Sequence, residues 1–361
     1  MVEVIFASDN DTDEWNEFVE NTSLGSLYHM WEWGETLSSI CGYRRYYLSA
    51  VQQERMVGIL PLIHVKSILF GNRLISLPFC EYGGPLVVSD GGAQEKKRVM
   101  KALVNDANKL ARTLGVGYVE MRKPVTEDAE EIMNAHGYTR LRRYVTFRLD
   151  LTKDPDGLWA NMHKSTRKAI RKALRNEVTT EKVEEEAQLR AFYMLYLRDM
   201  KRHGSPPHEY ALFKKLFDSF QEDSRMRVLL AKYRGHFIGG RIVFCDGRTV
   251  FCWNSVSDVK YRNLNPGNLL LWETIEWGLK NSYQFLEMGR TRKGTTVYDY
   301  KKGWGGQEVS LNEYIYFIDS NQRELPDPAQ TTYRCLAGVW SWVPIGLAEK
   351  IGPKVLSGIA L

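Results

Sequence analysis

The sequence has few cysteines, and their spacing is not that of a metal site or a disulfide framework. The 361 residues include five cysteines, an odd number. None of them belongs to a Cys-x-x-Cys pair, and no ladder of histidines stands nearby. We therefore interpret Cys41, Cys80, Cys245, Cys252 and Cys335 as small core residues of a protein in a reducing compartment, and we expect no bound metal.

The N-terminus has no cationic segment followed by an apolar run, which a secretory signal would require. We therefore expect a cytoplasmic protein, and an association with the inner face of the membrane stays open. Near the other end, residues 336–348 are uncharged and contain Trp340 and Trp342, but this stretch is too short and too broken for a spanning helix. We expect this tail to pack on the body, and a weak peripheral membrane contact through the two tryptophans is the alternative.

Catalytic side chains are equally hard to single out. The sequence shows neither a Ser/His/Asp arrangement nor a pair of carboxylates that points to a glycosidase. Lysine and arginine exceed aspartate and glutamate by 49 to 44, which is a formal net charge of +5. Such a mild excess permits an anionic partner without demanding one, so the local clusters of charge have to indicate the function.

The length of 361 residues and the apolar content of 43% are enough for a large core and for two domains. One order of elements is expected twice, namely a β-hairpin, a third strand, a loop, a helix and a closing strand. These elements are expected at residues 44–51, 55–65, 74–79, 93–114 and 117–122, and again at 225–233, 236–244, 249–255, 268–280 and 283–288. We interpret the pattern as an internal duplication in an α+β protein with mixed, largely antiparallel sheets. We place the domains at residues 1–150 and 151–325, followed by an apolar tail at 326–361.

The segment between the two halves carries a run of cations and no acids. Lys164, Arg167, Lys168, Arg171, Lys172 and Arg175 are spaced so that they share one face of a helix. The opposite face is apolar and consists of Leu158, Trp159, Met162, Ala169, Ile170 and Ala173. A merely solvated helix face normally intersperses acids for i, i+4 pairing. We therefore favour binding of a phosphate or polyanion over a solvated surface.

A glycine-rich stretch at residues 285–306 carries a second basic cluster. Its cations are Arg290, Arg292, Lys293, Lys301 and Lys302, and the glycines among them let the backbone turn sharply and approach a ligand. Tyr298, Tyr300 and Trp304 would form good walls for a pocket. The stretch predicts an anion-binding loop after a strand, and a solvated basic loop is the alternative. Arg202 lies in a further polar segment, 201–208, that could form the rim of a pocket.

Three stretches together resemble the FemAB (FemABX-like) transferases, including the members associated with exopolysaccharides. They are Trp159 with Lys164-x-x-Arg167-x-x-Ile170-Arg-Lys-Ala173, then Phe192-Tyr193 leading to Arg202-x-Gly204-x-Pro206, and Gly289-Arg290 through Tyr300-Lys301-x-x-Trp304-Gly305. The resemblance covers about residues 10–320. It implies two tandem GNAT-type acyltransferase domains and the transfer of an aminoacyl or acyl group to an amine. For the peptidoglycan-branching members it also implies an aminoacyl-tRNA donor and a nucleotide-linked acceptor. The coiled-coil insertion of some members is missing here.

Attack of an amine on an ester or thioester needs a cation or an N–H donor at the developing oxyanion. Lys301 matches the family's Phe/Tyr-Lys motif and is our candidate for that cation or for neutralising a donor phosphate, with Tyr300 and Tyr298 as further catalytic candidates. The expected phosphate and substrate ligands are Lys164, Arg167, Lys168, Arg171, Arg202, Arg290, Arg292, Lys293 and Trp304. If a proton acceptor is required, His203, Glu287 and Tyr298 are the candidates.

Several readings of the donor and of the function stay open. The expected acceptor is a phosphate-bearing envelope or polysaccharide precursor, and no cofactor is expected beyond an acyl donor as co-substrate. Residues 262–267 are a degraded form of the turn that binds the pyrophosphate of acyl-CoA at a helix N-terminus, with Pro266 lacking an N–H. We therefore favour aminoacyl-tRNA slightly over acyl-CoA. A non-catalytic nucleic-acid-binding protein is the alternative of another class, but the basic face lacks interleaved aromatics for base stacking.

Overall fold

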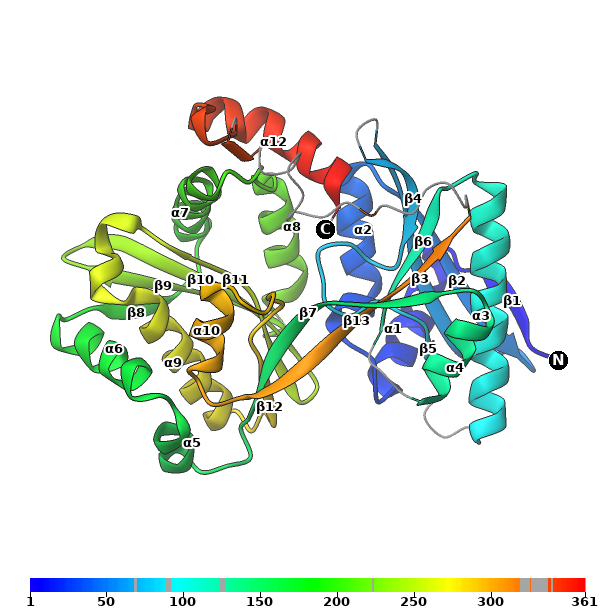
Figure 1. The fold of residues 1–361 in the computed structure, drawn as a ribbon, viewed down its shortest axis with the longest axis horizontal. Coiled ribbons are helices and arrows are strands. Elements are labelled where there is room, and N and C mark those ends of the chain that lie inside the picture. Colours follow the sequence, from blue (N-terminus) through cyan, green and yellow to red (C-terminus); the bar gives the residue numbers. More distant parts are fainter. Residues whose placement is uncertain are drawn as a thin grey trace. The chain divides into compact units, whose positions relative to one another are not determined.

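The computed structural model describes residues 1–67, 70–88, 92–123, 127–222, 224–318, 325, 337–338 and 340–360. The chain divides into two compact units (Figure 1). Unit 1 comprises Met1–Arg143, Leu311–Pro326 and Ser357–Leu361, and unit 2 comprises Tyr144–Ser310 and Asp327–Leu356. The division falls inside strand β7 (Thr139–Asp150), slightly before the boundary expected at residue 150, and strand β13 (Gln307–Phe317) likewise belongs to both units.

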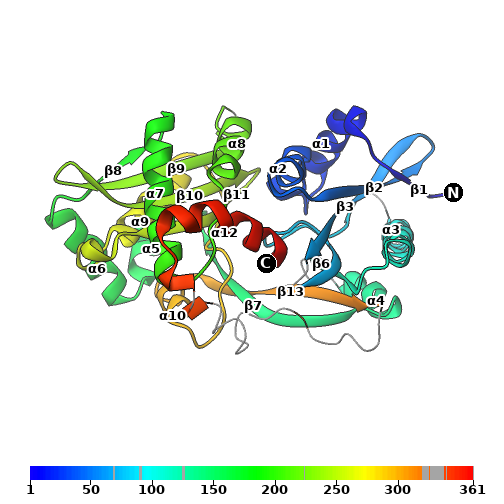
Figure 2. The same cartoon turned by 90° about the horizontal axis from the view of Figure 1, so that it is seen from above.

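Unit 1 is a sheet with strand order β1-β2-β3-β4-β6-β13, and β5 pairs with β3. Its strands are β1 (Glu3–Phe6), β2 (Arg44–Gln52), β3 (Arg55–Ser67), β4 (Gly71–Ile75), β5 (Leu86–Val87) and β6 (Tyr118–Lys123). Its helices are η1 (Asp9–Asp11), α1 (Thr12–Asn21), η2 (Leu27–His29), α2 (Trp31–Cys41), α3 (Ala93–Thr113) and α4 (Glu127–Ala135). Helices α1 and α2 lie on one face of the sheet and α3 and α4 on the other (Figure 2). The pairing of β4 with β6 is parallel, whereas β1, β2, β3 and β4 pair antiparallel in turn.

Unit 2 repeats this arrangement, with strand order β7-β12-β11-β10-β9-β8. Its further strands are β8 (Thr179–Lys182), β9 (Met226–Tyr233), β10 (His236–Asp246), β11 (Thr249–Ser257) and β12 (Phe285–Glu287). Its helices are α5 (Pro155–Asn161), α6 (Lys164–Arg175), α7 (Glu186–His203), α8 (Tyr210–Phe220), η3 (Val259–Leu264), α9 (Pro266–Lys280), α10 (Thr296–Lys302) and α12 (Ile345–Ile359). Only β11 and β12 pair in parallel among the strand pairs whose register is described in this unit.

The two units correspond element by element, which confirms the internal duplication predicted from the sequence. The series β1, α1, α2, β2, β3, β4, α3, β6, α4 and β7 of unit 1 matches β8, α7, α8, β9, β10, β11, α9, β12, α10 and β13 of unit 2. The α+β class with mixed, largely antiparallel sheets is likewise confirmed. Helices α5 and α6 precede β8 and are an addition to this pattern. The sequence interpretation had not included α4, β7, α10 or β13.

Two neighbouring glycines of β10 show how the helices cover both faces of the unit 2 sheet. A Cβ atom on Gly239 would lie 3.1 Å from Pro266 Cβ in α9, and one on Gly240 would lie 2.4 Å from Phe192 Cδ2 in α7. Because successive residues of a strand point to opposite faces, α9 and α7 pack on opposite sides of the sheet. The absence of side chains at these two positions lets both helices approach the strand closely.

Each unit has its own hydrophobic core. In unit 1 the apolar face of α3, with Val99, Leu103 and Ala107, packs on strands β2, β3 and β6. In unit 2 one core lies between α5, α6, α9 and the strands, and it includes Leu158, Ile170 and Leu271. Within the described part of the chain, none of the helices combines the length and the apolar character needed to cross a membrane.

Candidate active site

The candidate site lies in unit 2, near the point where strands β11 and β12 cease to pair. They pair in parallel only over residues 249–251 of β11, because β12 ends at Glu287 while β11 continues to Ser257. The chain then passes through η3 into α9. Asn265 precedes α9 in the left-handed conformation, with φ of 57°, and its side chain donates to Asn263 O instead of capping the helix. The first N–H groups of α9 are therefore not capped by that side chain, and such groups favour an anion.

Two side chains from other elements reach the same helix start. The phenol of Tyr300 in α10 donates to Gly267 O at 3.3 Å. The guanidinium of Arg241 in β10 lies with Nη2 3.5 Å from the same oxygen. Arg241 is 5% exposed, and its Nε has no hydrogen-bond partner among the described residues. The sequence analysis had assigned Tyr300 and the turn at Gly267 to separate features, and the structure brings them together.

The electrostatics of this cluster make Tyr300 a proton donor rather than a base. Desolvation of the hydroxyl raises the pKa of the Tyr300 phenol above its usual value, although the residue as a whole is 36% exposed, and the nearby positive charge of Arg241 only partly offsets that effect. The phenol is therefore protonated at neutral pH. A buried guanidinium without a carboxylate partner among the described residues is costly, so a bound anion would compensate the charge of Arg241.

Lys301, the expected oxyanion cation, has a structural contact. Its Nζ donates to Gly289 O at 2.7 Å and to Arg290 O at 3.0 Å. The expected loop contains the short helix α10, because Thr295 caps it by accepting a hydrogen bond from Tyr298 N at 3.1 Å. Lys301 therefore links α10 to the segment that follows β12, and a positioning role explains this geometry better than that of a free cation.

Tyr298 and Lys293 both contact the same carboxylate. The Tyr298 phenol donates to Glu308 at 2.6 Å, and Lys293 Nζ lies 2.6 Å from the other oxygen of that group. These two hydrogen bonds lower the pKa of Glu308, and the same contact raises the pKa of Tyr298. The Tyr298 phenol therefore holds its proton at neutral pH, so this geometry does not favour its role as a base.

Arg290 and Arg292 gather around one aromatic ring. Their guanidinium carbons lie 5.3 Å and 4.9 Å from the centre of the Tyr144 ring, and Arg292 Nη2 donates to the Tyr144 hydroxyl at 3.0 Å. Stacking on an aromatic face orients guanidinium groups, and a planar guanidinium matches the geometry of a phosphate. Both arginines thus lie in unit 2, as the sequence analysis expected, on the segment that Lys301 holds.

Trp304 is not a pocket wall, contrary to the sequence expectation. It is 1% exposed and belongs to the core beneath α5 and α6. The glycines on either side of it receive hydrogen bonds from Thr166 Oγ1, at 3.0 Å to Gly303 O, and from Asn161 Nδ2, at 2.8 Å to Gly305 O. These bonds join the start of α6 and the end of α5 to the residues that follow α10, so Trp304 is held in the core beside them.

The basic face of α6 is presented to solvent as the sequence predicted. Its lysines and arginines are exposed, except that Arg167 is half-buried and donates to Ala160 O at 3.2 Å. Arg171 lies over the Trp159 ring, with its guanidinium carbon 5.3 Å from the ring centre. Among the described residues, no carboxylate forms an ion pair with Lys164, Arg167, Lys168, Arg171, Lys172 or Arg175.

The remaining candidates are engaged in ion pairs. Arg202 at the end of α7 pairs with Asp199 at 2.6 Å, and His203 Nε2 lies 3.6 Å from the same carboxylate. Burial lowers the pKa of His203 more than Asp199 raises it. Glu287, which is 2% exposed, accepts from Arg148 Nε at 2.9 Å. None of these contacts involves Gly267, and the charge of Arg262 in η3 also lowers the pKa of His203.

Arg241 was missed by the sequence analysis. A signal for it existed, because it is the single charged residue in the otherwise apolar run Phe237–Cys245 of a predicted strand. A charged side chain is rarely buried in such a strand without a functional or structural reason. The pattern marks an unusual position, but it does not say that the side chain reaches the start of a helix.

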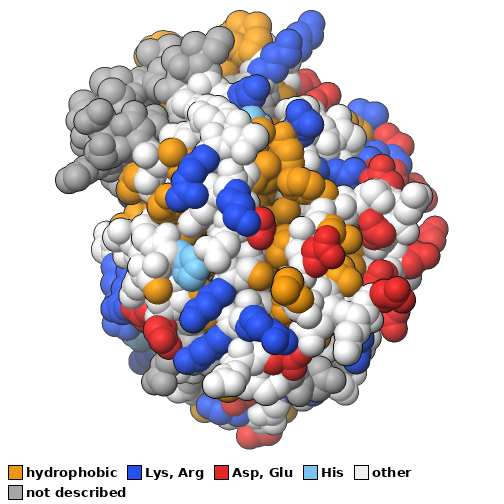
Figure 3. Space-filling view, turned by 90° about the vertical axis from the view of Figure 1, so that its right-hand side faces the viewer, with side chains coloured by type: hydrophobic (Ala, Val, Ile, Leu, Met, Phe, Trp, Pro, Cys, Tyr) orange, Lys and Arg blue, Asp and Glu red, His pale blue; other side chains and the backbone are white. Residues whose placement is uncertain are grey.

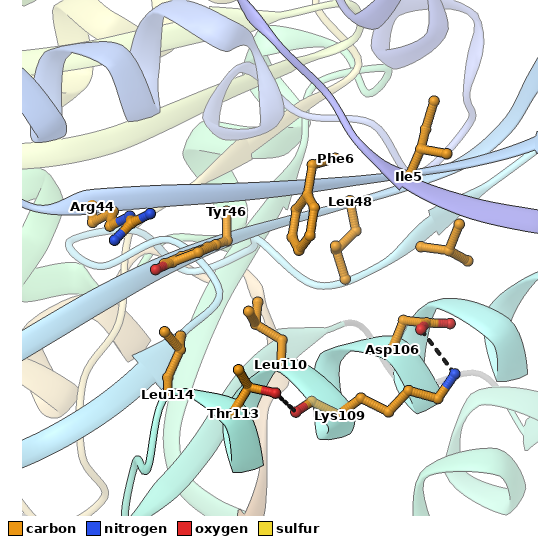
Figure 4. Close-up of a pocket in the computed structure, with 11 residues that line it drawn as sticks. Ile5, Phe6, Arg44, Tyr46, Leu48, Asp106, Lys109, Leu110, Thr113 and Leu114 are labelled. Carbon is orange, nitrogen blue, oxygen red and sulfur yellow. Dashed lines mark hydrogen bonds and ion pairs between the residues drawn. The ribbon is translucent and has the colours of Figure 1, made fainter.

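Unit 1 contains a separate hollow with a different character. The face of the molecule in Figure 3 shows hydrophobic side chains gathered in a band between basic and acidic ones. The hollow is lined mainly by apolar residues of β1, β2 and α3, including Phe6, Leu48 and Leu110 (Figure 4). Lys109 at its edge pairs with Asp106 at 3.0 Å. None of the residues that line this hollow is among the catalytic or binding candidates of the sequence analysis.

Comparison with known proteins supports the assignment of the fold. Residues 160–302 match the acetyltransferase (GNAT) domain family. None of the curated proteins matches the sequence. The solved structure of FemX has a TM-score of 0.70 and 15% identity, covering 88% of this chain and 98% of FemX. L-PGS from Bacillus licheniformis has a TM-score of 0.57 and 12% identity, covering 92% of this chain and 98% of that protein. A tandem GNAT protein from the clavulanic acid biosynthesis pathway has a TM-score of 0.56 and 13% identity, covering 88% and 98%.

These similarities agree with the duplicated architecture and with the position of the cluster inside the matched region. At such low identity the solved structures show the fold alone, and the family match covers residues 160–302, which lie in unit 2. Residues 160–302 are therefore similar to the GNAT acetyltransferase domain family, and the chain has the tandem GNAT fold seen in FemX over most of its length.

Proposed function

We propose that this chain is an N-acyltransferase that holds the activated end of its acyl donor in unit 2, at the start of α9. The observation that carries the proposal is the convergence of Gly267, Arg241 and Tyr300. An uncapped helix start and a buried guanidinium are suited to a phosphate or another anionic group of the donor. The protonated Tyr300 phenol supplies a hydrogen-bond donor for charge that develops on an oxygen.

The reaction joins an amine nitrogen to the carbonyl carbon of an ester or thioester. The new bond is C–N, the bond that breaks is C–O or C–S, and the amine releases a proton while the leaving group takes one up. The protein therefore has to hold the two reactants in line and stabilise the tetrahedral oxyanion. Lys301 contributes by holding the Gly289–Arg290 segment in place, and Arg290 and Arg292 lie there as ligands for a phosphate-bearing envelope or polysaccharide precursor.

The preferred donor is aminoacyl-tRNA, because the exposed cations of α6 form a broad basic surface. That surface is joined to α10 through the contact of Thr166 with Gly303. A small donor would not need so many cations, whereas a polyanion gains affinity from each neutralised phosphate. Acyl-CoA is the second candidate, since Arg241 and the start of α9 also fit a pyrophosphate. A FemAB-like aminoacyl transferase is thus our first choice and an acyl-CoA-dependent acetyltransferase our second.

Titration calorimetry with acetyl-CoA and, separately, with charged tRNA at low and high salt tests the donor. We expect tRNA binding that weakens steeply with salt in the unmodified protein. Reversing Lys168, Arg171 and Lys172 to glutamate should weaken that binding and flatten its salt dependence. The matched control reverses Lys153, Arg234 and Lys280, which are also exposed cations of unit 2, and should change affinity little.

The substitution Arg241→Gln tests the site itself. It removes the buried charge while keeping a shorter, polar side chain, so binding of the preferred donor should fall while the fold persists. Tight, weakly salt-dependent binding of acetyl-CoA without tRNA binding would select the second candidate. If the Arg241→Gln variant binds both acetyl-CoA and charged tRNA as tightly as the unmodified protein does, the proposed position of the donor is wrong.

A further inference from the structure

The C-terminal helix α12 uses only part of its circumference to pack on unit 2. Ala348 is 4% exposed, and Gly352 lies so close to the α7–α8 connection that a Cβ atom there would be 2.4 Å from Pro207 Cδ. These positions are spaced four residues apart and define the inner face of the helix. Glu349 is close enough to raise the pKa of Tyr193 in α7, although burial is the larger cause.

The outer face of α12 combines exposed apolar side chains with lysines. Leu347 is 48% exposed and Ile351 is 39% exposed, and Lys350 and Lys354 are exposed beside them. The four positions follow the spacing i, i+3, i+4 and i+7, so they form one stripe along the helix. Trp342, just before the helix, is 86% exposed. We call Trp342, Leu347, Lys350, Ile351 and Lys354 the outer stripe of α12.

Exposure of two aliphatic side chains in one stripe, with an exposed tryptophan just before the helix, is unfavourable in water, because removing each apolar side chain from water lowers the free energy. The lysines beside these apolar side chains indicate which environment would cover them. Lysines beside apolar residues keep their charge at a surface while their stems lie in an apolar layer, and tryptophan prefers the boundary between the two. The carboxylate of the helix, Glu349, belongs to the side near Tyr193 and not to the stripe.

From this combination of shape and charge, we propose that the outer stripe of α12 docks on an anionic phospholipid surface. The helix would lie in the plane of the interface, with Trp342, Leu347 and Ile351 entering the headgroup layer and with Lys350 and Lys354 contacting lipid phosphates. We favour a lipid surface over an apolar protein groove because the positive charges of Lys350 and Lys354 complement the negative charge of lipid phosphates. The inference does not depend on the acyl donor, and it would hold if the chain transferred no acyl group.

Vesicle co-sedimentation of the full chain tests this proposal. The vesicles contain either phosphatidylcholine alone or phosphatidylcholine mixed with phosphatidylglycerol. We expect binding to the anionic vesicles that is weaker at high salt. Reversing Lys350 and Lys354 to glutamate should weaken it by about tenfold or more, because each lysine near an anionic surface contributes to binding. Replacing Trp342, Leu347 and Ile351 with serine should weaken binding at low and at high salt alike, because the apolar part of the interaction is not screened.

Two controls distinguish vesicle binding through α12 from non-specific binding through other exposed apolar side chains and from binding through the basic face of α6. The double variant Met194→Ser and Val259→Ser removes apolar side chains of unit 2 that are 42% and 56% exposed, and it should bind the vesicles as the unmodified chain does. The variant with Lys168, Arg171 and Lys172 reversed to glutamate should retain most of the binding to anionic vesicles. The proposal is wrong if the unmodified chain does not sediment with anionic vesicles, or if the α6 reversal abolishes binding while the α12 variants retain it. A change in oligomeric state of the α12 variants, without vesicle binding, would indicate a second copy of the chain and would also overturn it.

Discussion

The substitution Lys301→Met separates the two roles considered for this lysine. Methionine keeps a long unbranched side chain but removes the ammonium group that donates to Gly289 O and Arg290 O. A hydrogen bond from a charged donor contributes about 1.5–3 kcal/mol. Since Lys301 is half-buried, water can replace part of each bond, and we expect a loss of about 2–3 kcal/mol from the free energy of unfolding of unit 2.

In a domain of this size such a loss lowers the melting temperature by roughly 5–10 °C. The assay is thermal unfolding followed by circular dichroism, together with acyl-transfer activity once a substrate pair is known. Lys302→Met is the matched control, because Lys302 is the adjacent residue and is exposed. Loss of an exposed lysine should change stability by less than about 0.5 kcal/mol. Lys301→Arg keeps a cationic donor and should restore part of the stability.

The reasoning fails if Lys301→Met melts within about 1 °C of the unmodified protein. If stability is unchanged and activity disappears, Lys301 is a free catalytic cation, as the sequence motif alone suggested. If stability and activity both fall and Lys301→Arg restores both, the lysine acts by holding the segment that carries Arg290. A loss of stability in the Lys302→Met control as large as in Lys301→Met would show that the effect comes from removing surface charge.

Further predictions concern the supports of both units. Arg122→Met should cost about 3–5 kcal/mol in unit 1, measured by denaturant unfolding, because it leaves the buried Glu120 without its partner at 2.8 Å. Burial alone would raise the pKa of Glu120, but the neighbouring Arg122 and Arg143 charges outweigh it and hold that pKa below its usual range. The stabilisation by Glu120 is therefore present above the unfolded-state pKa of about 4.3 and is lost as the pH falls through the lower folded-state pKa, which a series of melting curves in acid would reveal. Trp304→Ala should cost about 3–5 kcal/mol by leaving a cavity beneath α6, and an unchanged melting temperature would contradict its place in the core. Gly305→Ala should destabilise unit 2 in the same assay, because φ is 78° and the new Cβ would lie 2.6 Å from Asn161 O.

Much of the architecture could be read from the sequence because it depends on local patterns. The 3.6-residue period of α3 and the cations of α6 are properties of consecutive residues, so each helix and its exposed face follow from spacing alone. The β-hairpins of both halves and the duplication were likewise visible in the order of elements. The short elements β12 and α10 carry too few residues for a clear period, and the sequence interpretation placed α10 in a loop.

The candidate site was only partly predictable. The sequence indicated Tyr300 and the turn before α9, but a residue pattern cannot tell whether a side chain is available. Lys301 turned out to hold a backbone segment, and Trp304 to lie in the core. The same pattern of aromatics and cations fits a pocket wall and a buried support equally well.

The other features of the site could be seen only in the tertiary structure, because the residues that form them are far apart in the sequence. Arg241, Gly267 and Tyr300 come from three elements, a strand and two helices, and they meet because α9 packs closely on β10 at Gly239. Local periodicity contains no information on such a meeting, since it is set by how helices cover the sheet. The sequence by itself determined the elements, their duplication and the basic face of α6. The tertiary structure decided which side chains converge, because packing between distant segments selects the partners of each polar group.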